Sequence, residues 1–274
     1  MRLALKIAYD GRVFHGFARQ PALRTVEGEV RLALAKSRLV EDVDAANVRG
    51  SSRTDAGVSA IGNAIAFDTN AGEDEAIGRF NDAAKDVWAW ASAALLPGFD
   101  PRRALSRWYR YHLTDEHDAA KLGEIGQVFV GTHEYAVFAS PDARGTRRHV
   151  DTVEVLTVED GILVDVRAHS FLRGMVRRIV AGMVAVERGD ADLEALRAAL
   201  REGAGHDFGT LPPEPLTLMD VDLGLPFRPA VDRATREQIR ARASHARRAA
   251  RFWREAAARL DRAPGHRDSR NEAN

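Results

Sequence analysis

Residues 150–168 read VDTVEVLTVEDGILVDVRA. Apolar and polar residues alternate on both sides of the pair Asp160-Gly161, which favours the tight turn of a β-hairpin. The segment therefore predicts two antiparallel strands, at 150–158 and 162–168. An antiparallel hairpin in a chain that also carries helical patterns favours an α+β sheet over a doubly wound parallel sheet.

Similar patterns extend the predicted sheet in both directions along the chain. Alternating or apolar runs predict further strands at 3–9, 58–67, 87–96, 107–113 and 216–223. Apolar residues at helical spacing predict helices at 25–39, 71–85, 116–128, 171–186, 192–201 and 232–260. Strands and helices follow a similar order in each half, which predicts an N-terminal half at 1–105, a C-terminal half at 106–227 and a helical extension at 228–274.

Composition excludes several classes of protein. The 274 residues suit one large domain or two small ones, and the lack of cysteine excludes disulfides, thiolate metal sites and a cysteine nucleophile. Basic and acidic residues number 40 each, so a uniformly basic nucleic-acid coat is excluded. No apolar stretch approaches the roughly 20 residues that span a bilayer, and the first residues lack a signal-peptide pattern. We therefore expect a cytoplasmic protein with no membrane partner.

The balanced charge hides an uneven distribution. Residues 228–274 contain 13 arginines and 6 acidic residues, a net of +7 that leaves −7 for the rest of the chain. This extension either contacts RNA phosphates or packs on the acidic body, and the large apolar side chains of Phe252 and Trp253 favour packing. The last ten residues, 265–274, are predicted to fray.

The loop SSRTDAGV at residues 51–58 is the first candidate site. It places Asp55 just before an apolar strand, and Gly57 permits a positive φ or a close backbone approach. The alternative is an Asx turn, in which the Asp55 carboxylate bonds only to its own backbone.

The strand at 107–113 supplies the second candidate. Alternation places Tyr109 and Tyr111 on one face, with Trp108 and Arg110 on the other. Tyr109 could stack on a base or move a proton, and cross-strand packing is the alternative.

The apolar helix predicted at 171–186 supplies the third candidate, Arg177. It shares a helical face with Gly174 and Ala181, two residues small enough to let another backbone approach. A guanidinium buried in such a helix should be paired, because an unpaired buried charge is costly. A surface arginine whose aliphatic stem lies along the helix is the alternative.

Motifs for cofactors are absent from the sequence. The histidines show no metal-ligand spacing, and the glycine-rich nucleotide loops and the serine-nucleophile elbow are missing. We therefore expect neither a metal nor a nucleotide cofactor.

Together these segments resemble one family. Residues 53–58, RTDAGV, are similar to the active-site signature of the tRNA pseudouridine synthase A family. Four further elements match that family in order, at 9–20, 99–111, 171–180 and 216–221. Phe17, Ser52 and Trp108 depart from its usual pattern.

The resemblance implies a fold and an activity. The fold would be that of pseudouridine synthases: two similar ferredoxin-like halves form a mostly antiparallel central sheet, flanked by helices, with the active-site cleft between the halves. The enzyme would be an isomerase that converts uridine to pseudouridine in the tRNA anticodon stem–loop, at position 38, 39 and/or 40, without a cofactor. It would act as a homodimer on a uridine flipped out of its stack.

The resemblance also implies roles for particular residues. Asp55 would be the nucleophile, or the base, that starts glycosidic cleavage, with Arg177 as its ionic partner. Tyr109 would stack on the freed uracil, and Arg53 would hold a phosphate or take the place of the displaced nucleotide. The remaining predicted tRNA contacts are Arg19, Arg102, Arg147 and Arg148, the last two following a loop at 140–145 that could be mobile.

Two other functions remain open from the sequence. One is a non-catalytic RNA-binding protein on the same scaffold. The other is a carboxylate-dependent glycoside hydrolase, which needs a second acid about 5 to 9.5 Å from the first. The sequence offers no obvious second acid beside Asp55.

Overall fold

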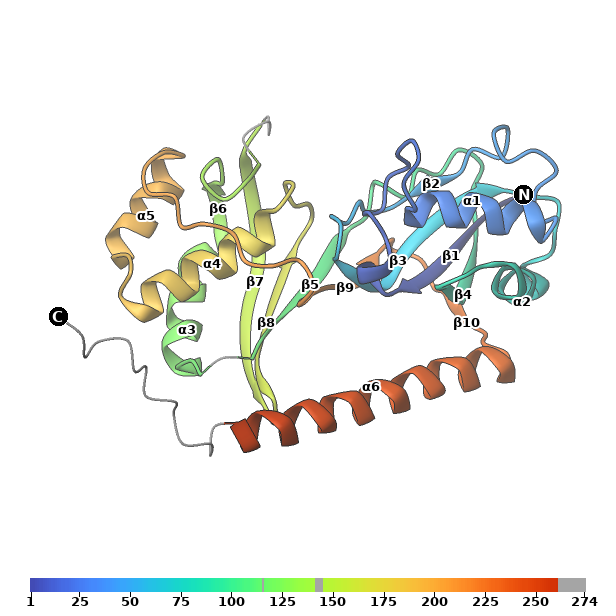
Figure 1. Cartoon of the computed structure of the whole chain (residues 1–274). Coiled ribbons are helices and arrows are strands. Elements are labelled where there is room, and N and C mark those ends of the chain that lie inside the picture. The colour runs from blue at the N-terminus through green and yellow to red at the C-terminus, as the bar shows by residue number, and fades with distance from the viewer. Residues whose placement is uncertain (115, 141–144, 261–274) are drawn as a thin grey trace. The chain divides into compact units, whose positions relative to one another are not determined.

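The computed structural model describes residues 1–114, 116–140 and 145–260 (Figure 1). Its centre is a ten-stranded sheet with the order β10-β4-β1-β3-β9-β5-β8-β7-β6, and β2 pairs with β3. The strands are β1 (Arg2–Tyr9), β2 (Arg49–Gly50), β3 (Ser59–Asp68), β4 (Val87–Leu95), β5 (Ser106–Leu113), β6 (Gly131–Glu134), β7 (Arg147–Val158), β8 (Gly161–Ala168), β9 (Leu216–Asp222) and β10 (Arg228–Pro229).

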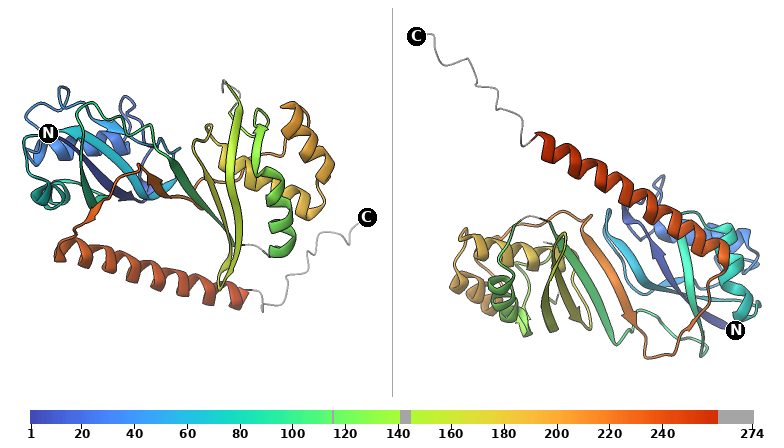
Figure 2. Two further views of the ribbon diagram at one scale, coloured as in Figure 1. Left: turned by 180° about the vertical axis from the view of Figure 1, so that it is seen from behind. Right: turned by 90° about the horizontal axis from the view of Figure 1, so that it is seen from below.

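The helices between residues 26 and 202 cover the sheet in two groups (Figures 1 and 2). The described helices are α1 (Val26–Lys36), α2 (Glu73–Ala83), α3 (Ala119–Gly126), α4 (Met175–Arg188), α5 (Leu193–Glu202) and α6 (Arg233–Leu260), with short 3₁₀ turns at Gly11–Val13 and Gln127–Phe129. Helices α1 and α2 pack against β4, whereas α3 packs against β7 and α4 against β5. The apolar faces of these helices form the core with the buried face of the sheet, as in α1, where Val26, Val30 and Leu34 are fully buried.

The sheet is antiparallel between all its described neighbours except β3 and β9. These two run parallel, with Ser59 opposite Thr217 and Ala60 opposite Leu218. The predicted mostly antiparallel α+β fold is therefore confirmed. The hairpin of β7 and β8 turns where the sequence predicts it, with Val158 opposite Gly161.

The largest error among the predicted helix boundaries lies at the start of α4. Helix α4 begins at Met175, not at residue 171, because Gly174 precedes it in the left-handed conformation with a φ of 74°. Phe171 therefore lies in a loop before the helix, and Gly174 does not share a helical face with Arg177. The apolar run 171–172 made the helix look longer, although its side chains pack from a loop.

By its internal contacts the chain divides into two compact units, Met1–Ala230 and Val231–Asn274. The described part of the second unit is α6. The predicted halves at 1–105 and 106–227 stay a prediction, and so does the extension from 228. The predicted frayed segment 265–274 and residues 141–144 of the predicted mobile loop lie outside the described residues. Among the described helices, none combines the length and apolar character needed to cross a membrane.

Candidate active site

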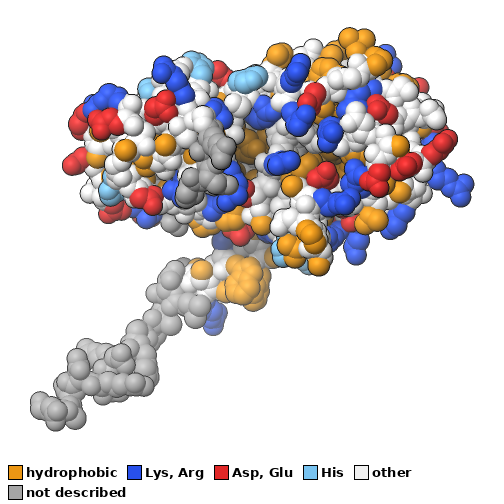
Figure 3. Space-filling view, turned by 90° about the horizontal axis from the view of Figure 1, so that it is seen from above, with side chains coloured by type: hydrophobic (Ala, Val, Ile, Leu, Met, Phe, Trp, Pro, Cys, Tyr) orange, Lys and Arg blue, Asp and Glu red, His pale blue; other side chains and the backbone are white. Residues whose placement is uncertain are grey.

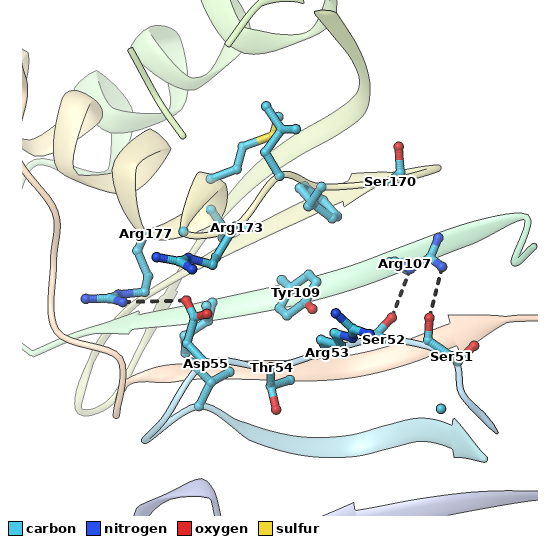
Figure 4. A pocket seen from close by; sticks show the side chains of 18 of the residues that line it. Ser51, Ser52, Arg53, Thr54, Asp55, Arg107, Tyr109, Ser170, Arg173 and Arg177 are labelled. Carbon is cyan, nitrogen blue, oxygen red and sulfur yellow. Dashed lines mark hydrogen bonds and ion pairs between the residues drawn. The ribbon is translucent and has the colours of Figure 1, made fainter. Parts of the chain in front are cut away.

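A cavity of about 580 Å³ lies where the loop after β2, strand β5 and the start of α4 meet (Figure 4). Its lining includes five guanidinium groups and one carboxylate. These charged lining residues are Arg53, Asp55, Arg102, Arg107, Arg173 and Arg177. The excess of positive charge suits a ligand that carries several negative charges.

Asp55 reaches this cavity from a tight turn. The Val58 N–H donates to the Asp55 carbonyl at 3.2 Å, and Gly57 adopts a φ of 86°. A Cβ at Gly57 would lie 2.9 Å from Cγ of Pro213, so a larger residue would push that neighbour away. Within the described part of the chain, no backbone N–H bonds to the Asp55 carboxylate, so the arrangement is not an Asx turn. Its side chain is 35% exposed and open to a ligand.

Asn63 and Tyr9 connect this loop to the sheet through hydrogen bonds. Asn63 is fully buried on β3, and its Nδ2 donates to the Ser52 carbonyl at 2.9 Å and to the Tyr9 hydroxyl at 3.1 Å. The Tyr9 hydroxyl in turn lies 2.9 Å from Oγ1 of Thr54. Burial raises the pKa of Tyr9 to about 12, so this hydroxyl stays protonated at neutral pH. The network joins both ends of the segment 52–54 to the sheet.

Arg107 ties the same loop to β5. Its guanidinium is buried and donates from Nε to Oγ of Ser52 at 2.9 Å and from Nη2 to the carbonyls of Ser51 and Arg102 at 3.2 and 2.9 Å. Nη1 donates to the carbonyl of His169. Burial lowers the pKa of Arg107, and its hydrogen-bond acceptors in the described chain are all neutral. The planar Arg107 guanidinium, with its five N–H donors, therefore links β5 to residues 51–52, to Arg102 and to His169.

Tyr109 forms part of the cavity wall beside Arg107 (Figure 4). It is buried on β5, and a shift in the pairing with β9 occurs between Trp108 and Tyr109. Its ring meets the ring of Phe171 edge-on, with centroids 5.2 Å apart. Burial raises the pKa of Tyr109 far above its usual value, so the phenol is neutral at physiological pH.

Arg177 faces Asp55 from the first turn of α4. Its Nη1 lies 3.7 Å from Oδ2 of Asp55, which is salt-bridge distance but longer than a hydrogen bond (Figure 4). Its Nε donates to the Leu211 carbonyl at 2.6 Å. Its side chain is 19% exposed, so Arg177 is a largely buried, oriented cation and not a solvated surface arginine. The structure thus brings Asp55, Tyr109 and Arg177 together in one cavity.

Comparison with known proteins identifies the family. A family model described as tRNA pseudouridine synthase matches residues 125–222. The tRNA pseudouridine synthase A of Thermococcus sibiricus is 40% identical over 224 residues, which cover 81% of this chain and 84% of the relative. That of Pyrococcus horikoshii is 41% identical over 220 residues, covering 78% and 81%. This chain belongs to the tRNA pseudouridine synthase A family.

This chain also matches a chain of a solved structure. That match is a chain of the archaeal box H/ACA Nop10–Cbf5 complex, 14% identical, with a TM-score of 0.30 over 61% of this chain and 43% of that one.

Two of the residues predicted to contact tRNA, Arg53 and Arg102, line the cavity. Arg53 is exposed at its edge, and Arg102 makes a two-pronged ion pair with Asp100, at 2.9 and 2.6 Å. Hydrogen bonding to Arg102 lowers the pKa of Asp100 to about 2, so the pair stays ionised at neutral pH. Arg102 is still 63% exposed and can meet a second anion.

The other three predicted contacts lie outside the cavity lining. Arg19 is an exposed residue whose backbone N–H donates to Glu27. Arg147 and Arg148 begin β7, where an Arg148 Nη1 donates to the Arg147 carbonyl at 2.8 Å. A face of the molecule seen from above gathers Lys and Arg side chains around a hollow (Figure 3). Any RNA contact by these three residues stays a prediction.

Sequence patterns had not marked Asn63 or Arg107 as part of a site. A signal for Arg107 existed, because alternation along β5 puts it on the same face as Tyr109, two residues away. Asn63 gave no local signal, since its partners are distant in the sequence. Among the described residues, no group of His, Asp and Glu could hold a metal ion.

Proposed function

We propose that this protein isomerises uridine to pseudouridine in tRNA, at position 38, 39 and/or 40 of the anticodon stem–loop. Membership of the tRNA pseudouridine synthase A family supports the reaction class. The observation that carries the proposal is the Asp55 carboxylate, 3.7 Å from Arg177 and in one cavity with Tyr109. A half-exposed carboxylate oriented by a cation is a suitable nucleophile at a sugar carbon.

The reaction begins at Asp55. Its carboxylate oxygen attacks C1′ of the flipped uridine, the C1′–N1 bond breaks, and uracil leaves with the bonding electron pair; attack on the base ring is the alternative route. The uracil then turns in the cavity, its C5 attacks C1′, and the bond to the Asp55 carboxylate breaks. Loss of the C5 proton and gain of a proton at N1 complete the product. Atoms and electrons balance without an oxidant, a reductant or a cofactor.

The neighbours of Asp55 assist this chemistry in different ways. Arg177 orients the carboxylate before attack and balances its charge when it is released. Tyr109, neutral because of its raised pKa, offers a flat ring against the detached uracil and a hydroxyl that can donate but not act as a phenolate base. Arg53 and Arg102 hold the phosphates on either side of the flipped nucleotide.

The rest of the tRNA would lie on a wider surface. Arg19, Arg147 and Arg148 would contact its backbone, and the active species would be a cytoplasmic homodimer with tRNA lying across both subunits. Extrusion of a stem uridine costs a few kcal/mol of stacking and pairing energy, which these phosphate contacts would offset.

The test uses purified protein and tRNA transcripts with uridine at one of positions 38, 39 and 40. We expect pseudouridine at one or more of these positions with wild-type protein and none with Asp55→Asn. Tight tRNA binding without product from the wild-type protein would instead support a non-catalytic RNA-binding protein. Product only at other positions would overturn the assignment of the stem–loop.

A further inference from the structure

Most charged residues of helix α6, Arg233–Leu260 (Figure 1), fall on one side at about 100° per residue, with Arg242 as the exception. It contains nine arginines, no lysine and two glutamates. Arg233, Arg240, Arg247 and Arg254 recur every seven residues, so they lie in one strip along the helix. The strip is about 30 Å long at about 1.5 Å per residue.

A second side of α6 is apolar except for Arg242. At about 100° per residue, Ile239, Ala246, Ala250, Trp253 and Ala257 fall within one narrow stripe about a quarter of a turn from the arginine strip. Because the arginine strip and the apolar stripe face different directions, a protein surface and a polyanion could be bound at the same time. Alanine makes up most of this stripe, which leaves little apolar area for insertion into a membrane.

Three of the four arginines in the strip have no ionic partner among the described residues. Arg233 pairs with Glu237 at 2.7 Å and Arg251 with Glu255 at 2.9 Å. Arg240, Arg247 and Arg254 are exposed, and no described carboxylate lies within salt-bridge distance of them. Three uncompensated guanidinium groups about 10 Å apart form a row that complements a phosphate backbone, whose oxygens arginine binds with two parallel hydrogen bonds.

We propose that α6 is an RNA-binding arm that contacts tRNA phosphates through Arg240, Arg247 and Arg254. This inference rests on the proposed function, since it takes tRNA as the substrate. The arm adds a binding surface outside the catalytic cavity, because none of its residues lines that cavity. It contributes affinity through release of counterions and leaves the chemical step unchanged.

The test compares two full-length variants with the same change in net charge. The first is Arg240→Gln/Arg247→Gln/Arg254→Gln, in which glutamine keeps helix propensity. The matched control is Arg31→Gln/Arg197→Gln/Arg201→Gln, whose arginines all have carboxylate partners in the first unit. The measurements are Kd for a tRNA transcript at several salt concentrations, pseudouridine formation at saturating tRNA, and helix content by circular dichroism.

We expect the α6 variant to bind tRNA at least tenfold more weakly at low salt, with a salt slope flatter by about 2 to 3. In the control variant, the loss of tRNA affinity and the flattening of the salt slope should each be less than half as large. Both variants should keep wild-type turnover at saturating tRNA. Equal slopes for the two variants would overturn the proposal. The proposal would also be overturned if the wild-type protein bound anionic vesicles, the α6 variant did not, and the tRNA affinity of that variant were unchanged. Absence of pseudouridine with wild-type protein would contradict the proposed function but leave the slope comparison valid.

Discussion

At the scale of single residues, the cavity offers one carboxylate. Asp55 is the one acidic side chain among the described residues that line it. A glycoside hydrolase needs a second carboxyl group nearby, to donate or accept a proton across the bond that breaks. The neighbours of Asp55 are instead Arg177 and the neutral Tyr109. This composition disfavours hydrolysis and suits a reaction in which the detached base is kept and used again.

Replacing Asp55 by Asn removes the proposed nucleophile and its charge with little change in shape. We expect pseudouridine formation to fall by at least about 1,000-fold, because an amide oxygen is a poor nucleophile. Affinity for tRNA should stay within about threefold, since phosphate contacts supply most of it. Single-turnover assays on enzyme from a host without its own pseudouridine synthase of this class measure the loss. Activity within tenfold of wild type would contradict the assigned role.

Tyr109 gives a prediction about pH. Its raised pKa means that the folded enzyme keeps the phenol protonated well above pH 10, the ordinary value for tyrosine. We therefore expect no alkaline change in kcat from this group between pH 7 and about 9.5. Tyr109→Phe, which keeps the ring, should stay within about tenfold of wild type, and Tyr109→Leu should lose about 100-fold. An increase in kcat towards high pH that disappears in Tyr109→Phe would reveal a phenolate base.

At the scale of elements, Arg107 links the Asp55 loop to β5 and to the chain after β8. Arg107→Lys keeps the charge but not the planar guanidinium group. The variant should therefore lose two or three of the hydrogen bonds to Ser51, Ser52 and Arg102. We expect Tm to fall by about 4 to 8 °C and kcat by about tenfold with a smaller change in KM. The KM-against-kcat comparison separates displacement of the loop from loss of tRNA contact.

A control for Arg107 lies on the opposite face of the same strand. Arg110 pairs with Asp165 at 2.7 Å, and a lysine there keeps an ionic partner. Arg110→Lys should therefore leave kcat within about twofold of wild type. If both variants lose kcat equally, Arg107 acts through the stability of β5 and not through the position of the Asp55 loop.

Sequence patterns predicted elements with strong periodicity and missed those without it. Alternation along β5 places Tyr109 and Tyr111 on one face, as predicted, and the structure buries that face. Strands β2 and β10 have two residues each and β6 has four, too few to show a period. The start of α4 was missed because the left-handed cap at Gly174 is a backbone feature, whereas the apolar run before it continues the helical pattern.

At the scale of the whole molecule, the pairing of β3 with β9 builds the site. It joins residues 59–60 to 217–218, more than 150 positions apart, and thereby brings the Asp55 loop beside β5. No local pattern specifies such a contact, because side-chain alternation shows that a strand exists but not which strand it pairs with. The family resemblance supplied the candidate residues Asp55, Tyr109 and Arg177, whereas the hydrogen bonds of Arg107 and Asn63 required the assembled sheet.

The expected homodimer gives a prediction about mass. One chain has a mass of 30.1 kDa, so light scattering should report about twice that value at micromolar concentration. The measurement should be repeated in 0.5 M salt, which weakens contacts between exposed charges but not an apolar interface. A single 30 kDa species at low salt would contradict the dimer.

The apolar stripe of α6 gives a prediction about its packing. Ile239 and Trp253 share that stripe, and a lone helix cannot cover its own apolar side, so we expect them to be buried on the body or on a second subunit. Ile239→Ser/Trp253→Ser should then lower Tm by about 5 °C, because each buried side chain contributes about 1.5 to 3 kcal/mol. Phe252→Ser removes a neighbouring aromatic ring off the stripe and should change Tm by less than about 1 °C.

Truncation after Ala230 spares β10, whose Arg228 pairs with Ser92 on β4, and should lower Tm as much as the stripe variant does. Pseudouridine formation at saturating tRNA should survive truncation, since no residue of α6 lines the cavity. An unchanged Tm in both the truncated and the stripe variants would show that α6 is a solvated appendage.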